Sequence, residues 1–211
     1  MLTQLLKTHL GEISGLTTEI YAYRGLGNLP SGKISPSELK RQTLLNDLPR
    51  IVAGLTKSHS HHGTSYQVIL VVICDLDNKD EHEFQMQLNS LLEKHTQSRL
   101  PTFSFLAIEE GEAWFLGDIE AVLAAYPSAD KAILRRYKPD SICGTWEMLA
   151  DAVHVGGSTE LKKSDWLTQG KCKCEWALRI TPHINIDRNK SPSFRKFGSF
   201  ILNQKRELGI S

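Results

Sequence analysis

The stretch that decides the fold is VILVVICDLD, residues 68–77. Six apolar residues, most of them β-branched, lead directly into Asp75 and Asp77. A continuous apolar run of this length is typical of a strand that is buried on both faces, as in a parallel sheet. Ligands of open α/β sheets bind beyond the carboxyl ends of the strands. We therefore expect the two acids at the ligand-binding edge of a parallel sheet.

The spacing of these acids favours a divalent cation. Asp75 and Asp77 lie two positions apart, so they share a side of the chain while Leu76 points away. Paired carboxylates repel each other unless a cation neutralises them or one of them takes a proton. Mg²⁺ prefers oxygen ligands and keeps several waters. The pattern favours metal-dependent phosphate chemistry with Mg²⁺ or Mn²⁺, and ordinary turn chemistry is the alternative.

Strands and helices alternate around this run. We expect further strands over 17–23 and 103–108, and helices that open at the capping signals Ser35, Asp80, Asp118, Asp130 and Ser191. This order predicts an α/β fold with a mainly parallel central sheet flanked by helices. We expect one domain over 1–211, with a core at about 15–126 and a helical C-terminal region at about 127–211.

A second acidic group follows the strand expected at 103–108. It comprises Glu109, Glu110 and Glu112. If the two strands are neighbours, Glu109 and Glu112 converge with the aspartates and are candidate metal ligands. The alternative is that these glutamates lie on the exposed face of an amphipathic turn.

A third polar segment, TPHINIDRNKSPSF, precedes the last predicted helix. Its candidate phosphate donors are His183, Arg188, Lys190 and, just beyond it, Arg195. The alternative is a polar loop in which Ser191 caps the helix.

Bulk composition excludes several classes of function. The 211 residues carry a net charge of +1, with 40% hydrophobic and 23% charged residues, so any contact with nucleic acid needs a local basic patch. No apolar stretch approaches the roughly 18 residues that span a membrane, and the N-terminus is too polar for a secretory signal. We therefore expect a cytoplasmic protein that does not enter membranes.

Cysteines and histidines add weaker metal signals. Cys172 and Cys174 form a C-x-C pair with no second pair to complete a zinc site, so incidental thiols are favoured. His59, His61 and His62 lie in a polar Ser/Gly loop, where solvated side chains are favoured over ligands.

Four motifs carry a resemblance to a known family. They are RGLGNLPSG, VVICDLDNKD, AIEEGEAWFLGD with the following AVLAAYP, and TPHINIDRNKSPSFRKF. Over nearly its whole length the chain resembles a family of small bacterial proteins described as a domain of unknown function. Members of that family look like compact Toprim-type domains, which occur in topoisomerases, primases and overcoming-lysogenization-defect nucleases.

The resemblance implies an activity and a site. Asp75 and Asp77 would be the Mg²⁺-binding pair for phosphoryl transfer, and Glu109 would match a further acid of the nuclease-like relatives. These three are the candidate catalytic residues, and Glu112 joins them as a candidate ligand. An anti-phage or DNA-repair setting beside an ABC-type or AAA-type ATPase is also implied.

The sequence departs from the family pattern at its start. Relatives begin with a strand that ends in Glu-Gly, whereas this sequence begins inside the helix that follows that strand. We expect either a start codon further upstream or the loss of one metal ligand. A missing strand would leave a sheet edge for something to cover, and a second copy of the chain is one candidate.

Two functions therefore stay open. The first is a Mg²⁺-dependent nuclease component that hydrolyses phosphodiester bonds in DNA or RNA. The second is a catalytically inactive Toprim-like docking or regulatory partner of the ATPase. No Walker loop is present, so ATP binding of the P-loop type is not expected.

Overall fold

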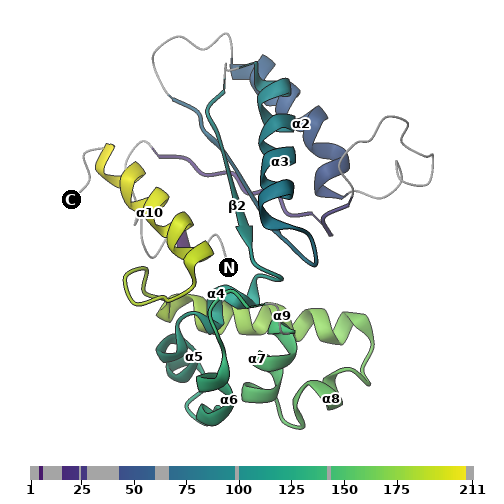
Figure 1. Cartoon of the computed structure of the whole chain (residues 1–211), viewed down its shortest axis with the longest axis vertical. Coiled ribbons are helices and arrows are strands. Elements are labelled where there is room, and N and C mark those ends of the chain that lie inside the picture. The colour runs from purple at the N-terminus through teal and green to yellow at the C-terminus, as the bar shows by residue number, and fades with distance from the viewer. Residues whose placement is uncertain are drawn as a thin grey trace. The chain divides into compact units, whose positions relative to one another are not determined.

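The computed structural model describes residues 5–6, 16–23, 25–27, 43–59, 67–97, 100–141 and 144–207. The chain divides into two compact units. We call residues 20–106 the sheet unit, and residues 107–211 together with 1–19 the helical unit. The described part combines helices with a small parallel two-stranded sheet, which confirms the α/β class (Figure 1). The expectation of one domain with a boundary near residue 126 stays a prediction.

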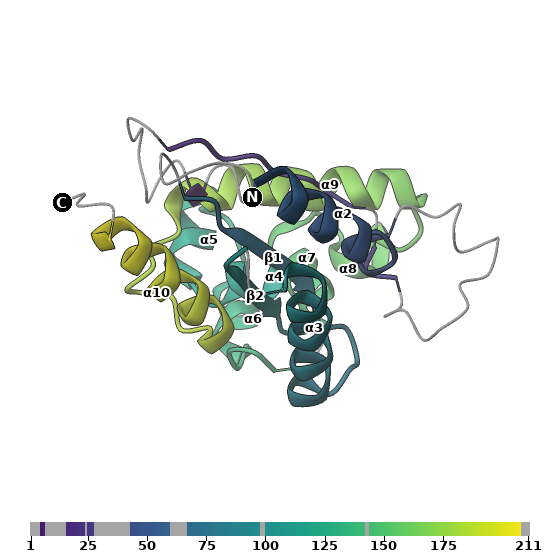
Figure 2. The ribbon, with the colours of Figure 1, turned by 90° about the horizontal axis from the view of Figure 1, so that it is seen from above.

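The sheet unit is built on a strand–helix–strand motif. β1 (Leu70–Asp75) and β2 (Thr102–Ala107) pair with each other, and α3 (Glu81–Thr96) connects them (Figure 2). β1 is the strand predicted from VILVVICDLD, and its Val72 and Cys74 are buried. Parallel strands need a long crossover connection, which α3 provides.

Two helices of the sheet unit pack against each other. α2 (Leu44–His59) lies beside α3, as Figure 1 shows. Both helices bury apolar residues at helical spacing: Leu45, Leu48 and Val52 in α2, and Phe84, Leu88 and Leu92 in α3. The predicted start of α3 is confirmed, because the Asp80 carboxylate accepts a hydrogen bond from the Glu83 amide at 2.8 Å.

The strand expected over 17–23 is wrong. These residues carry no regular secondary structure. Ile20 and Tyr21 are 42% and 61% exposed, so the apolar members of the alternating pattern bury little surface and gain little from strand pairing. The helix expected from Ser35, most of RGLGNLPSG, and His61 and His62 lie outside the described residues.

The described α-helices of the helical unit range from 5 to 16 residues, and several begin at a side-chain cap. The predicted caps are confirmed, because Asp118 and Asp130 accept hydrogen bonds from the amides that follow them. The elements are α4 (Glu112–Leu116), α5 (Ile119–Ala125), α6 (Lys131–Arg136), α7 (Thr145–Val153), α8 (Gly157–Leu161), α9 (Trp166–Ile180), the 3₁₀ turn η1 (Thr181–His183) and α10 (Pro192–Glu207).

An aromatic cluster joins α4 and α10 of this unit. The Trp114 ring of α4 stacks on Phe197 of α10 and meets Phe194 edge-on, with centroid distances of 5.4 Å in both cases. Phe194, Phe197 and Ile201 are buried, as the predicted apolar face of the last helix requires. Its predicted cap is also confirmed, since the Ser191 hydroxyl accepts from the Phe194 amide at 3.1 Å.

Candidate functional site

The aspartate pair lies where β1 ends. Asp75 and Asp77 are both exposed, whereas Leu76 between them is only 2% exposed. Asp77 has a φ of 52°, a left-handed conformation that turns the chain back toward α3. Its carboxylate pairs with the Lys79 ammonium at 3.3 Å, and both side chains are solvent-accessible. Two carboxylates thus face solvent beyond the carboxyl end of a parallel strand.

The residue immediately before this pair, Cys74, carries a buried thiol. Burial first, and then the negative charge of Asp75, raise the pKa of the Cys74 thiol to about 12, while the positive charge of Lys79 acts in the opposite direction. Cys74 is therefore a neutral, apolar packing residue at physiological pH.

Glu109 performs a structural task in the helical unit. Its φ is 64°, and its two carboxylate oxygens accept hydrogen bonds from the backbone amides of Gly144 at 2.8 Å and Thr145 at 3.0 Å. These amides open α7, where the helix dipole favours a negative charge. A carboxylate retains acceptor sites beyond two such bonds, so this geometry leaves metal binding by Glu109 chemically open.

Glu110 and Glu112 share one lysine. The Lys173 ammonium lies 3.2 Å from Glu110 Oε1 and 3.8 Å from Glu112 Oε1. The Glu112 side chain is 9% exposed, whereas those of Glu110 and Lys173 are 25% and 34% exposed. Lys173 also lies over the Trp146 ring at 5.2 Å. The repulsion expected between neighbouring carboxylates is thus offset by an ammonium of the chain itself.

Arg188 is committed to a buried acid. Its Nε and Nη2 donate to Asp118 Oδ1 and Oδ2 at 2.7 and 2.9 Å, and the Asp118 side chain is 0% exposed. The hydrogen bonds that the Arg188 guanidinium donates to Asp118 raise its pKa. Nη2 also donates to the His183 carbonyl oxygen at 3.0 Å, so His183 enters this contact through its backbone.

Lys190 and Arg195, the other two candidate phosphate donors, are exposed. The residue between Arg188 and Lys190, Asn189, is not one of the four candidate phosphate donors and is 1% exposed. Its side-chain amide donates to the Trp114 carbonyl oxygen at 2.8 Å, and its Oδ1 accepts from the Ser191 amide at 2.9 Å. A buried asparagine with both ends bonded fixes this loop against α4.

Asp140 is a second contributor that the sequence did not single out. Its carboxylate accepts from the Ser191 hydroxyl and from the Ser193 amide, both at 2.6 Å. The Ser193 hydroxyl in turn accepts from Trp114 Nε1 at 3.0 Å. The two serines of the Ser191–Ser193 segment are recognisable in the sequence as a helix start. The acid to which they donate, Asp140, lies about fifty positions earlier and could not be matched to them from the sequence.

The candidate residues therefore fall into separate groups. Glu109 bonds to the start of α7, Glu110 and Glu112 pair with Lys173, and Arg188 pairs with Asp118. Asp75 and Asp77 belong to the sheet unit. Within the described ranges, no three His, Cys, Asp or Glu side chains gather as a metal-binding group, and no helix is long and apolar enough to cross a membrane.

Comparison with known proteins places the chain in one family. The family model described as "Domain of unknown function (DUF4276)" matches residues 2–201. Neither a curated protein nor a solved structure matches the chain.

Proposed function

We propose that this chain, which belongs to the DUF4276 family, is the Toprim-like, Mg²⁺-dependent nuclease component of a bacterial defence or DNA-repair system that also contains an ATPase. The reaction would be phosphodiester hydrolysis in DNA or RNA. The observation that carries the proposal is the exposed Asp75–Asp77 pair at the carboxyl end of β1.

The donor set of this pair fits the cation. Two carboxylates supply hard oxygen ligands, and the remaining coordination positions suit water, which Mg²⁺ retains. The Lys79 contact with Asp77 does not oppose this, because an exposed ion pair contributes only about 0–1 kcal/mol. Bound Mg²⁺ supplies charge neutralisation at a phosphate and a more acidic water.

Two cations of the helical unit are suited to hold a phosphate. The side chains of Lys190 and Arg195 form no ion pair within the described residues, whereas Arg188 is occupied by Asp118. The ATPase partner and the defence setting rest on the resemblance of the sequence motifs to Toprim-type relatives.

A second function is favoured by the structural contacts of Glu109, Glu110 and Glu112. Glu109 holds the start of α7, and Lys173 forms ion pairs with Glu110 and Glu112. If these glutamates are structural only, Glu109 does not supply the third catalytic acid that the nuclease function requires beside Asp75 and Asp77. The chain would then serve as an inactive Toprim-like docking partner of the ATPase.

A cleavage assay separates the two functions. Labelled single-stranded and duplex DNA and RNA are incubated with Mg²⁺ or Mn²⁺ and with wild-type protein, Asp75→Asn or Glu93→Gln. Glu93 is an exposed acid of α3, so its substitution removes the same charge from the same unit. The nuclease function predicts cleavage that Asp75→Asn abolishes and Glu93→Gln preserves. Cleavage that survives in Asp75→Asn contradicts it, and no cleavage by any form favours the docking function.

A further inference from the structure

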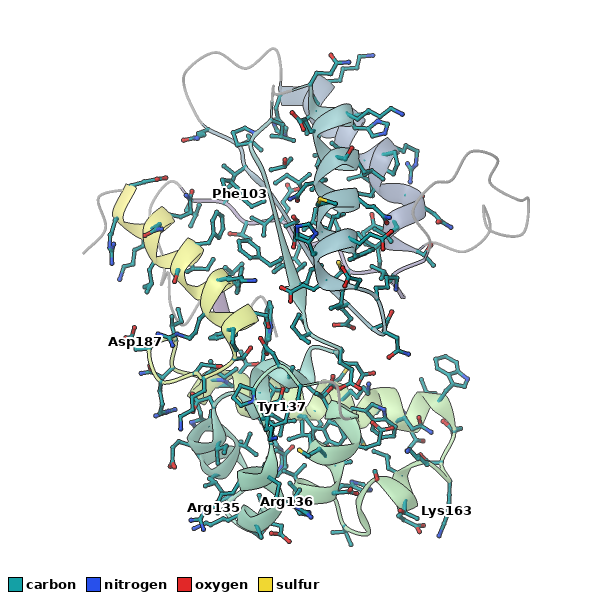
Figure 3. All side chains as sticks on the ribbon, in the orientation of Figure 1. Phe103, Arg135, Arg136, Tyr137, Lys163 and Asp187 are labelled. Carbon is teal, nitrogen blue, oxygen red and sulfur yellow. The ribbon has the colours of Figure 1, made fainter. Side chains whose placement is uncertain are left out.

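Four cations crowd one short segment of the helical unit. Lys131, Arg135, Arg136 and Lys138 all lie within or just beyond α6, and all four are exposed. We call them the α6 basic surface. Leu134 and Tyr137 on the same segment are 0% and 7% exposed and anchor it to the core. Figure 3 shows Arg135 and Arg136 on α6, at the edge of the helical unit in that view.

These cations have no acidic partner among the residues that the structure describes. Seven other Lys and Arg side chains of the described residues form ion pairs: Arg50, Lys79, Lys162, Lys163, Lys173, Arg179 and Arg188. No side chain of the α6 basic surface forms an ion pair or hydrogen bond with any described residue. In a chain of net charge +1, this concentrates positive potential at one place.

The two acids that flank α6 in the sequence accept hydrogen bonds from backbone amides and a serine hydroxyl. Asp130 accepts from the amides that begin α6, and Asp140 accepts from the Ser191 hydroxyl and the Ser193 amide. α7 packs against α6 and carries two more acids. Of these, Glu147 pairs with Lys162, and Asp151 accepts from the Ser158 amide at 2.6 Å. Within the described residues, none of these acids therefore forms an ion pair with a cation of the α6 basic surface.

The surface continues toward two further cations. The Asp140 contacts hold the loop after α6 against the start of α10. Lys190 and Arg195 flank the two serines that Asp140 binds, and both are exposed. The segment bearing Lys138 therefore lies beside the one that bears Lys190 and Arg195.

We propose that the α6 basic surface binds the phosphate backbone of duplex nucleic acid. Arginine presents a planar fork of donors that matches phosphate oxygens. Tyr137, the aromatic residue of this segment, is buried and its hydroxyl accepts from the Asp140 amide at 3.1 Å, so it offers no stacking platform for unpaired bases. The segment also exposes no large apolar side chain, which disfavours insertion into a lipid surface or a hot spot for an acidic protein.

This inference rests on the proposed function for its class of ligand, a polynucleotide, but its test requires neither metal nor cleavage. Binding of a labelled duplex of roughly 20 base pairs is followed by fluorescence anisotropy in EDTA, between about 50 and 200 mM salt. Four phosphate contacts predict a slope of log K against log salt of about −4. The Arg135→Gln/Arg136→Gln variant should reduce the magnitude of this slope by about 2, and it should weaken duplex binding at low salt at least roughly tenfold.

A matched variant controls for net charge. Lys205→Gln/Arg206→Gln also removes two cations from the last turn of a helix, α10, and should bind as wild type does. Equal weakening by both variants would overturn the proposal, as would absence of duplex binding at low salt. Binding to vesicles with about one third phosphatidylserine that depends on Arg135 and Arg136, without duplex binding, would assign the surface to membranes instead.

The outcomes also separate this proposal from the nuclease function. If the wild type cleaves, and Arg135→Gln/Arg136→Gln retains both cleavage and duplex binding, the proposal for the α6 basic surface is contradicted and the nuclease function is supported. Duplex binding that depends on these arginines, without cleavage under any metal, does the reverse.

Discussion

The Arg188 guanidinium and the Asp118 carboxylate form a two-pronged ion pair, with Nε–Oδ1 and Nη2–Oδ2 distances of 2.7 and 2.9 Å. Asp118 also accepts from the amides of Ala121 and Asn185, so one buried acid joins the start of α5 to the segment before α10. Arg188, a candidate phosphate donor in the sequence, therefore stabilises the fold of the helical unit.

Substitution of Arg188 should therefore destabilise the protein. Arg188→Met leaves the buried Asp118 carboxylate without its cation. We expect the free energy of unfolding to fall by about 2–3 kcal/mol. This is at or below the low end of the loss expected when a buried ion pair is broken, because solvent screens the Arg188 side chain, which is 44% exposed. Urea denaturation measures this, with Arg195→Met as the exposed control. If Arg188 served only to bind phosphate, the two variants would be equally stable.

Gly117 is expected to tolerate no side chain. A Cβ there would overlap Asn189 Oδ1 and lie 2.8 Å from Ser191 Cβ. Gly117→Ala should lower stability by about 1–3 kcal/mol, because the buried loop that it touches is held by hydrogen bonds. Gly170→Ala is the matched control, since a Cβ at this helical position meets nothing within 4 Å and should stabilise by roughly 0.5–1 kcal/mol. Equal effects of the two substitutions would refute the packing described for Asn189.

Glu109 should matter for stability even without metal. Glu109→Ala removes the acceptor for two amides at the start of α7, and we expect a loss of about 1–2 kcal/mol in EDTA. Amide exchange at Gly144 and Thr145 should also accelerate. Glu120→Ala, an exposed acid in the first turn of α5, is the control and should change stability by less than about 0.5 kcal/mol. A Glu109 that acted only as a metal ligand would leave both quantities unchanged.

Cys74 should resist alkylation in the native protein. Its pKa is raised to about 12, so its thiolate is scarce at pH 8.5, and its side chain is buried. Iodoacetamide labelling followed by peptide mass spectrometry should modify exposed Cys174 first and Cys74 only in denaturant. Rapid native labelling of Cys74 would contradict the burial.

The same pKa shift predicts a dependence of stability on pH. The unfolded thiol ionises near 9.0 and the folded thiol near 12. The stability that Cys74 contributes is therefore complete below about pH 9 and is lost as the pH rises toward 12. Cys74→Ala should show a shallower loss of stability across this window.

Local patterns explain which elements could be predicted. β1 and α3 follow from an unbroken apolar run and from Asp80 three residues before Glu83, signals contained within a few positions. The strand expected over 17–23 failed because an alternating pattern needs a neighbour and a buried face, and Ile20 and Tyr21 are exposed instead.

Partners distant in sequence explain what could not be predicted. Glu109 reaches Gly144 across 35 positions, and Arg188 reaches Asp118 across 70. Nothing near either residue distinguishes a structural carboxylate or guanidinium from a catalytic one. The four cations of the α6 basic surface can be read from the sequence, but their lack of ion-pair partners among the described residues depends on how the chain folds.

Calorimetric titration of Mn²⁺ and Mg²⁺ into wild type, Asp75→Asn and Glu93→Gln tests whether Asp75 and Asp77 form a divalent metal site. We expect saturable binding to wild type and Glu93→Gln that is lost in Asp75→Asn. Binding that Asp75→Asn retains in full, or no binding to the wild-type protein, would contradict this expectation.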